Sequence, residues 1–193
     1  MRPTKVLMTE HRNIERVLDC LERMTVLADT SGHLDGASAR EALAFFRGYA
    51  DRCHHGKEEE MLFPMMERRG FPGDSGPLAV MRDEHEIGRG HIRAMDQAIN
   101  GAETGDVEAL QSFARHARAY VLLLRDHIEK EDHCLFRMAD ESLSAADQEE
   151  LTAQFERVDR DLPTDATPQD LLRSADRLVE RYTAASDETV ACD

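Results

Sequence analysis

Tryptophan is absent from this 193-residue chain, and aromatic residues make up only 5% of it. Few residues are of the kinds that favour long strands, whereas Ala, Leu, Glu, Arg and Met are abundant, so the composition favours helix. With 41% hydrophobic and 33% charged residues, the chain does not fit the intrinsically disordered class and fits a soluble globular protein. Its length is enough for one domain with a substantial core.

Positive charge is scarce, because 24 lysines and arginines stand against 39 aspartates and glutamates, which gives a net charge of −15 at pH 7. Nucleic acid and anionic membranes would repel such a field. We therefore expect no nucleic-acid partner and no membrane partner.

Cysteine is sparse and unpatterned. The four cysteines form no C-x-x-C pair, which favours reduced thiols over a disulfide framework. The N-terminus lacks the apolar segment of a signal peptide, and no stretch approaches membrane-spanning length. These features lead us to expect a cytoplasmic location.

Four amphipathic stretches carry apolar residues at helical spacing and are separated by short segments rich in Gly. This pattern predicts an all-α fold, an antiparallel up-down four-helix bundle. The expected helices run from Thr4 to Ala28, from an N-cap at Ser38 to Arg69, from Ser75 to Ile99, and from Asp106 to Met138. Pro64 should bend the second helix or end its regular part, and Asn100 to Gly105 should form a turn.

Two additional C-terminal helices are predicted after the bundle. A capping-box pattern at Ser144 to Asp147 opens the first, which runs to about Asp161, and Thr167-Pro168 opens the second. We expect both to pack on the outside of the bundle or in a homo-oligomer contact. The domain division is then 1–141 for the bundle and 142–193 for the helical appendage, with a linker at Leu162 to Thr167 and a frayed end from Ser186.

An internal repeat organises the chain. His54-x-x-Lys-Glu-Glu-x-x-Leu-Phe recurs as His127-x-x-Lys-Glu-Asp-x-x-Leu-Phe. Each copy places a His and a Glu one helical turn apart, on the same helix face. Glu10-His11 precedes the first copy at nearly the same interval as Glu84-His85 precedes the second.

The repeat predicts a metal site with four imidazoles and two carboxylates. Burying two ionised carboxylates without a cation would be costly, and a thiolate-free N/O set does not favour structural zinc. Two carboxylates can each bridge two metals, as in carboxylate-bridged di-iron bundles. The expected ligands are His11, His54, Glu58, His85, His127 and Glu131.

His55 is a rival to His54, because Glu59 follows it at the same spacing. The stripe through His54 is apolar, and the Leu-Phe pair stands at the same distance after His54 as after His127. We therefore choose the pair His54 and Glu58.

The other histidines fit surface or packing roles, with one open alternative. His91 lies about 120° from the face of His85 on an ideal helix, so it is a surface residue or a neighbour of the ligands. Tyr120 lies on the stripe of His127. It is either a core aromatic residue or a hydrogen-bond donor beside the metals.

With these motifs, the sequence from Thr4 to Met138 resembles the hemerythrin-like (HHE cation-binding) family. The segment Lys57 to Pro64 is similar to that of its bacterial members. The resemblance implies a four-helix bundle with two iron ions in a non-heme di-iron centre, bridged by Glu58 and Glu131 and by an oxo or hydroxo group. Arg89 departs from the oxygen carriers, which have a further His at this position.

The resemblance favours a di-iron protein that reacts with small oxidants (peroxide, nitric oxide or oxygen) in oxidative or nitrosative stress defence. Two alternatives stay open, an oxygen- or iron-sensing module and an iron donor for iron–sulfur repair. Because Arg89 replaces an imidazole, we expect a second open position, rapid oxidation in air, and a longer-lived oxygenated form in Arg89→His, unless water or His91 fills the position.

Overall fold

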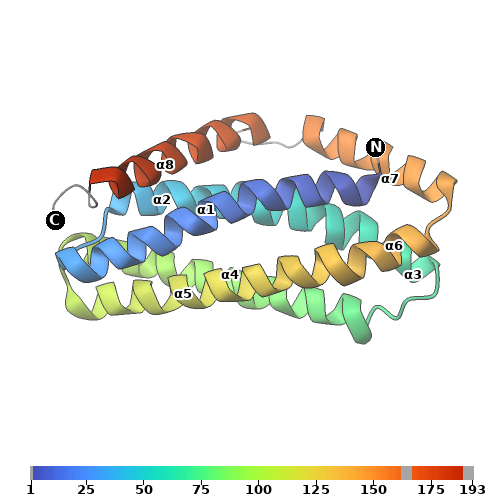
Figure 1. Cartoon of the computed structure of the whole chain (residues 1–193). Helices are drawn as coiled ribbons and strands as arrows, with labels where there is room; N and C mark the ends of the chain where they lie inside the picture. The colour runs from blue at the N-terminus through green and yellow to red at the C-terminus, as the bar shows by residue number, and fades with distance from the viewer. Residues whose placement is uncertain (1, 162–166, 189–193) are drawn as a thin grey trace.

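The computed structural model describes residues 2–161 and 167–188, and within these ranges every residue is helical or lies in a turn or cap between helices (Figure 1). The expected all-α class is confirmed. The segments in chain order are α1 (Pro3–Ser31), α2 (Gly36–Phe45), η1 (Phe46–His55), η2 (Glu58–Leu62), α3 (Phe63–Arg68), α4 (Gly76–Glu103), α5 (Val107–Lys130), η3 (Glu131–Leu135), α6 (Phe136–Ser142), α7 (Ala145–Asp161) and α8 (Pro168–Glu188).

The first connection differs from the expected one at both ends. α1 continues to Ser31 and ends at Gly32, whose φ of 76° suits glycine and whose N–H donates to Ala28 O at 3.0 Å. Asp35, and not Ser38, caps α2, because its carboxylate accepts the N–H of Ser38 at 3.1 Å. The expected cap was wrong because Asp and Ser are both good caps, and Asp35 lies one turn earlier.

The connection between α4 and α5 is tighter than expected. α4 continues through Glu103, so the turn is shorter than the expected Asn100–Gly105 segment. Asp106 caps α5, accepting the N–H of Ala109 at 3.0 Å. The capping box at α7 is also formed, with Ser144 and Asp147 exchanging hydrogen bonds between side chain and backbone.

Three segments are π-helical, with i→i+5 hydrogen bonds and a wider turn than an α-helix. η1 and η2 lie within the helical run that starts with α2 and ends with α3, and η3 joins α5 to α6. η2 and η3 occupy equivalent positions in the two repeats, whereas η1 has no counterpart in the second. Pro64 lies in the first turn of α3, where regular α-helix resumes after η2, so the proline does not end the regular part of the run; the departure from α-helix begins earlier, at Phe46.

Figure 1 shows the long helical segments lying side by side along the long axis of the molecule. α4 packs against α5 and α2, and α1 packs against α5 and η1. α8 lies along α1, α2 and η1, while α7 contacts α1 and η2. None of the described helices is long and apolar enough to cross a membrane.

Two apolar clusters form the core. One cluster includes Leu18, Phe46, Met95 and Leu124, and the other includes Phe63, Met81 and Phe136. On each long segment, the buried His and Glu residues fall between residues of the two clusters. A buried polar layer therefore separates two apolar layers.

The C-terminal helices contribute to both apolar clusters. Leu151 and Phe155 of α7 belong to one, and Ala175, Leu178 and Tyr182 of α8 belong to the other. The division at residue 141 stays a prediction. The predicted linker residues 162–166 and the end of the chain from 189 lie outside the described residues, and α8 is helical through Glu188.

Candidate metal centre

Seven buried side chains meet in the polar layer, five imidazoles and two carboxylates. They are His11, His54, His55, Glu58, His85, His127 and Glu131. The set contains all six residues singled out from the sequence, together with His55.

The first metal group consists of His11, His54, Glu58 and Glu131, whose ligand atoms lie within 4.8 Å of one another. His11 Nε2 is 3.2 Å from Glu131 Oε2, and His54 Nε2 is 3.5 Å from Glu58 Oε1. Two imidazoles from α1 and η1 and two carboxylates from the starts of η2 and η3 could thus hold one ion.

The second metal group consists of His55, Glu58, His85 and His127, again within 4.8 Å. The Nε2 atoms of His85 and His127 are 3.0 Å apart, and Glu58 Oε2 lies 3.6 Å from His85 Nε2. Glu131 Oε2 also approaches, at 3.3 Å from His127 Nε2. Both carboxylates therefore lie where they could bridge two ions.

His55 was passed over in favour of His54, but the structure buries both imidazoles in the centre. The α-helical spacing used for that choice separates consecutive residues by about 100°. Both residues lie in η1, where the wider π-helical turn lets neighbours share a face. The equivalent position in the second repeat is Ile128, in the regular helix α5. The repeat therefore gave no signal for His55.

A carboxylate lies within hydrogen-bonding distance of Nδ1 in four of the five imidazoles, which turns Nε2 toward the centre. The pairs are His11 with Asp132 at 2.7 Å, His54 with Glu10 at 2.9 Å, His85 with Glu59 at 2.6 Å, and His127 with Glu84 at 2.9 Å. Such outer carboxylates orient metal-binding imidazoles and raise their basicity.

The outer carboxylates follow the internal repeat. Glu10 corresponds to Glu84, and each also contacts a lysine of the repeat, Lys57 or Lys130. Lys57 is fully buried and lies over the ring of Phe155 of α7 at 5.8 Å, whereas the side chain of Lys130 is 43% exposed. The repeated Glu and Lys positions were the signal from which these contacts could have been predicted.

His11 and His85, the single histidines that precede each His-x-x-x-Glu motif, are contacted by residues of the opposite repeat. Phe136 of the second repeat stacks on His11, with ring centroids 5.5 Å apart, and Phe63 of the first stacks on His85 at 6.2 Å. Glu59 of the first repeat holds His85 in the same way. The lone His of each half is thus held in place by the other half.

The two inner carboxylates have opposite pKa shifts. Burial, followed by the nearby charge of Glu131, raises the pKa of Glu58 well above its usual range. Burial also acts to raise the pKa of Glu131, but the contacts with His127 and His11 outweigh it and lower that pKa. Without a cation, a proton on Glu58 relieves the repulsion between the two carboxylates.

The pKa values of the imidazoles are also shifted in opposite directions. Burial and the nearby His11 lower the pKa of His54, and burial and the nearby His85 lower that of His55. Burial would also lower the pKa of His127, but Glu131 and Glu84 outweigh burial and raise it to about 9. His127 must therefore lose a proton before Nε2 can bind a metal.

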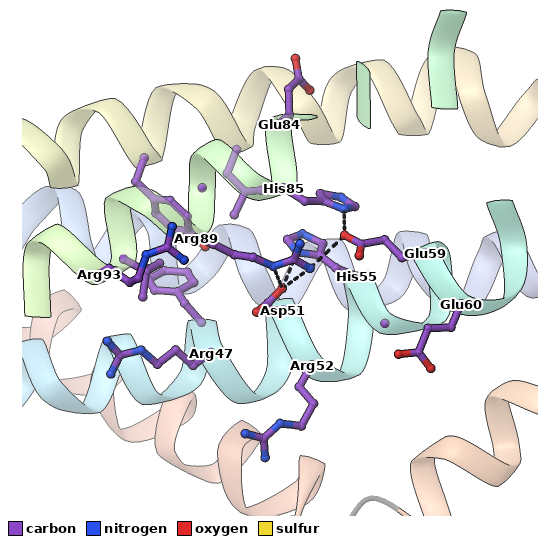
Figure 2. Close-up of a pocket in the computed structure, with 16 residues that line it drawn as sticks. Arg47, Asp51, Arg52, His55, Glu59, Glu60, Glu84, His85, Arg89 and Arg93 are labelled. Carbon is purple, nitrogen blue, oxygen red and sulfur yellow. Dashed lines mark hydrogen bonds and ion pairs between the residues drawn. The ribbon is translucent and has the colours of Figure 1, made fainter. Parts of the chain in front are cut away.

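A cavity of about 450 Å³ opens beside the second metal group. His55 and His85 form part of its wall, and Phe46, Ile92 and Tyr120 form an apolar part. Figure 2 shows Arg89 reaching across this cavity between Asp51 and Glu59. A small molecule in the cavity would lie next to the imidazoles of the second metal group.

The three residues predicted near the ligands lie in different places. Arg89 contacts Glu59, which holds His85. Tyr120 is buried in the cavity wall, edge-to-face on Phe46. His91 faces His116, with Nδ1 atoms 3.0 Å apart.

The donor set fits a pair of metal ions. Within the described part of the chain, neither oxygen of Glu58 and neither oxygen of Glu131 forms a well-aligned hydrogen bond, although all four atoms are buried and imidazole Nε2 atoms approach the two carboxylates at 3.2 to 3.6 Å. Unsatisfied buried carboxylate oxygens are costly unless a cation pairs with them. Imidazole and carboxylate donors without thiolate suit iron, manganese or zinc in a non-structural site.

Comparison with known proteins gives a family match over most of the chain. The family model described as "Hemerythrin HHE cation binding domain" matches residues 2–139. Uncharacterized proteins from Mycobacterium bovis and Mycobacterium tuberculosis are 24% identical to the chain over 150 residues, which is 78% of this chain and 58% of theirs. The chain therefore spans less than two thirds of the length of these relatives. No solved structure matches.

Proposed function

The chain belongs to the hemerythrin HHE cation-binding family, and from this premise we propose that it is a non-heme di-iron protein that binds or reacts with small oxidants. In this proposal it is an antiparallel up-down four-helix bundle that binds or reacts with peroxide, nitric oxide or oxygen. Its role would be oxidative or nitrosative stress defence in the cytoplasm. When bound, the iron pair would supply redox-active positions for these molecules.

The observation that carries this proposal is the pair of buried carboxylates with unsatisfied oxygens. Glu58 and Glu131 lie between two groups of imidazoles, each within reach of His residues from both halves. A single ion would leave part of this donor set unpaired, whereas two ions use all of it. The family match supports a bound cation, and the N/O donors are compatible with iron.

The surroundings of the centre support small molecules as its ligands. The cavity beside His55 and His85 gives access from one side, while Phe136 covers His11 on the other. Peroxide, nitric oxide and oxygen are small and uncharged, so the net charge of −15 does not repel them. The chain's own residues would limit water and, through the outer carboxylates, orient the imidazoles that bind the ions.

We predict two iron ions per chain. Protein made in iron-replete cells and purified without oxygen is analysed for metals, and its absorbance is recorded as oxygen, peroxide and nitric oxide are added separately. Spectral change with at least one of these at two irons per chain is the expected result. A stoichiometry that stays at or below one metal of any kind would sink the two-ion proposal.

A further inference from the structure

Arg89 stands where an oxygen carrier would have a further imidazole, and its own contacts give it a different role. Its guanidinium lies 2.7 Å from Asp51 Oδ1 and 2.9 Å from Glu59 Oε1. The Glu59 carboxylate lies within hydrogen-bonding distance of Nδ1 of His85, and Asp51 Oδ1 lies 3.5 Å from Nδ1 of His55. One arginine of α4 therefore connects to two imidazoles of the second metal group (Figure 2).

His55 has the environment of a metal ligand without a partner. It is 5% exposed, its Nε2 has no hydrogen-bond partner within the described residues, and its Nδ1 has only the long 3.5 Å contact with Asp51. The other four imidazoles each have a carboxylate within 2.9 Å of Nδ1. A buried imidazole nitrogen without a partner is costly, and an ion in the second metal group would supply the partner that Nε2 lacks.

We propose that His55 is the fifth imidazole of the centre and that Arg89 is a positioning residue which holds His55 and His85 through Asp51 and Glu59. This proposal rests on the two-ion centre proposed above. The position that Arg89 leaves without a ligand is then filled from η1, on the neighbouring helical run. His91, the other residue considered for that position, pairs with His116 instead.

The ring of His55 stacks on that of His85, with centroids 3.8 Å apart and planes inclined by 16°. Two parallel rings do not both point a nitrogen at one ion, so His55 binds after rotation about its Cβ–Cγ bond. His55 forms part of the cavity wall, so one side of its ring faces open space and not packed side chains. Asp51, with its side chain 35% exposed at the rim, is held by Arg89 next to the His55 ring.

The first experiment counts bound imidazoles. Metal-free full-length protein is loaded with Co²⁺ under anaerobic conditions, and the hyperfine-shifted, solvent-exchangeable N–H proton resonances are counted by NMR. Each bound imidazole keeps one N–H, so we expect five such signals at two cobalt ions per chain, and four in His55→Gln. Four signals in the wild type at two ions per chain would overturn the assignment of His55 and leave the two-ion centre standing. Fewer than two bound ions would instead contradict the two-ion centre itself.

The second experiment measures what Arg89 does. Competition with a chelator gives the affinity for the second Co²⁺, and Arg89→Gln should weaken it by roughly 10- to 100-fold, the usual effect of losing an outer contact. Arg47→Gln is the matched control, because Arg47 lines the same cavity and pairs with Asp96 rather than with Asp51 or Glu59. Equal affinities in the Arg89 and Arg47 variants would refute the positioning role.

The path from Arg89 to His55 is tested at Asp51. If Asp51 acts through His55, the affinity losses of Asp51→Asn and His55→Gln are not additive in the double variant. Additive losses of affinity would show that Asp51 does not act through His55 and would contradict this part of the proposal. On the same reasoning Arg89→His removes a contact to Asp51 and Glu59, so a loss of the second ion is expected rather than an added ligand.

Discussion

At the scale of single residues, the three consecutive glutamates Glu58, Glu59 and Glu60 differ only in what they face. Glu58 is fully buried between the metal groups, Glu59 lies within hydrogen-bonding distance of Nδ1 of His85, and Glu60 is exposed. We predict that Glu58→Gln removes most bound metal, that Glu59→Gln weakens binding by roughly 10- to 100-fold, and that Glu60→Gln has no effect. Metal content after dialysis against a graded chelator gives this order. A greater loss in Glu60→Gln than in Glu58→Gln would place the wrong carboxylate in the centre.

The residues of the centre were predictable to the extent that they repeat. The repeated spacing of His54 to Glu58 and of His127 to Glu131 was enough to predict these four residues as ligands, and the structure brings them together. The outer carboxylates were missed although their positions also repeat. Which imidazole each one meets depends on how the helices face one another, and a one-dimensional pattern does not contain that.

At the scale of helices, α4 and α5 approach so closely at their connection that a side chain is not tolerated. A Cβ at Gly101 would lie 2.6 Å from the Cβ of Ala109. We expect Gly101→Ala to lower the free energy of unfolding by about 1–3 kcal/mol, because neither rigid methyl group can move aside without shifting a helix. Denaturant unfolding followed by circular dichroism measures the change.

Gly90→Ala is the matched control in the same helix. A Cβ there meets only the end of the Arg93 side chain, at 3.9 Å. This substitution should raise stability by about 0.5–1 kcal/mol, since alanine loses less backbone freedom than glycine on folding. Stabilisation by both variants would show that the two helices are not in close contact at Gly101.

Helix positions were predictable from apolar spacing, but the π-helical turns were not. η1 contains Phe46, Ala50, Arg52 and other residues that also occur in α-helices, and nothing in their order marks the wider turn. The exclusion of His55 followed from applying one helical period to the whole run. A local change of period reverses which neighbours share a face, and packing against other helices decides where that change occurs.

At the scale of the whole molecule, metal binding is linked to proton release. With a pKa of about 9, His127 carries a proton at neutral pH until a metal displaces it. Burial and the nearby Glu131 also raise the pKa of Glu58, so a second proton leaves when the carboxylate pairs with a cation. Because protons are products of binding, the apparent metal affinity should rise with pH and level off above about 9.

Chelator competition at several pH values between about 6 and 9 tests this slope. Calorimetry in two buffers of different ionisation enthalpy counts the protons released per ion. We expect net release at neutral pH. Affinity that is constant over the range, or that falls as pH rises, would contradict the assignment of a protonated His127 in the metal-free protein.

The crosswise support of His11 and His85 has a consequence for how the protein matures. Phe136 and Asp132 come near the end of the bundle, and they hold a histidine near its start. A nascent chain that has completed only its first half therefore has His54 with its partner Glu10, but its His11 lacks the residues that hold it. Capture of metal becomes a late event that follows the meeting of the two halves, so the loaded centre reports that the whole bundle has been assembled.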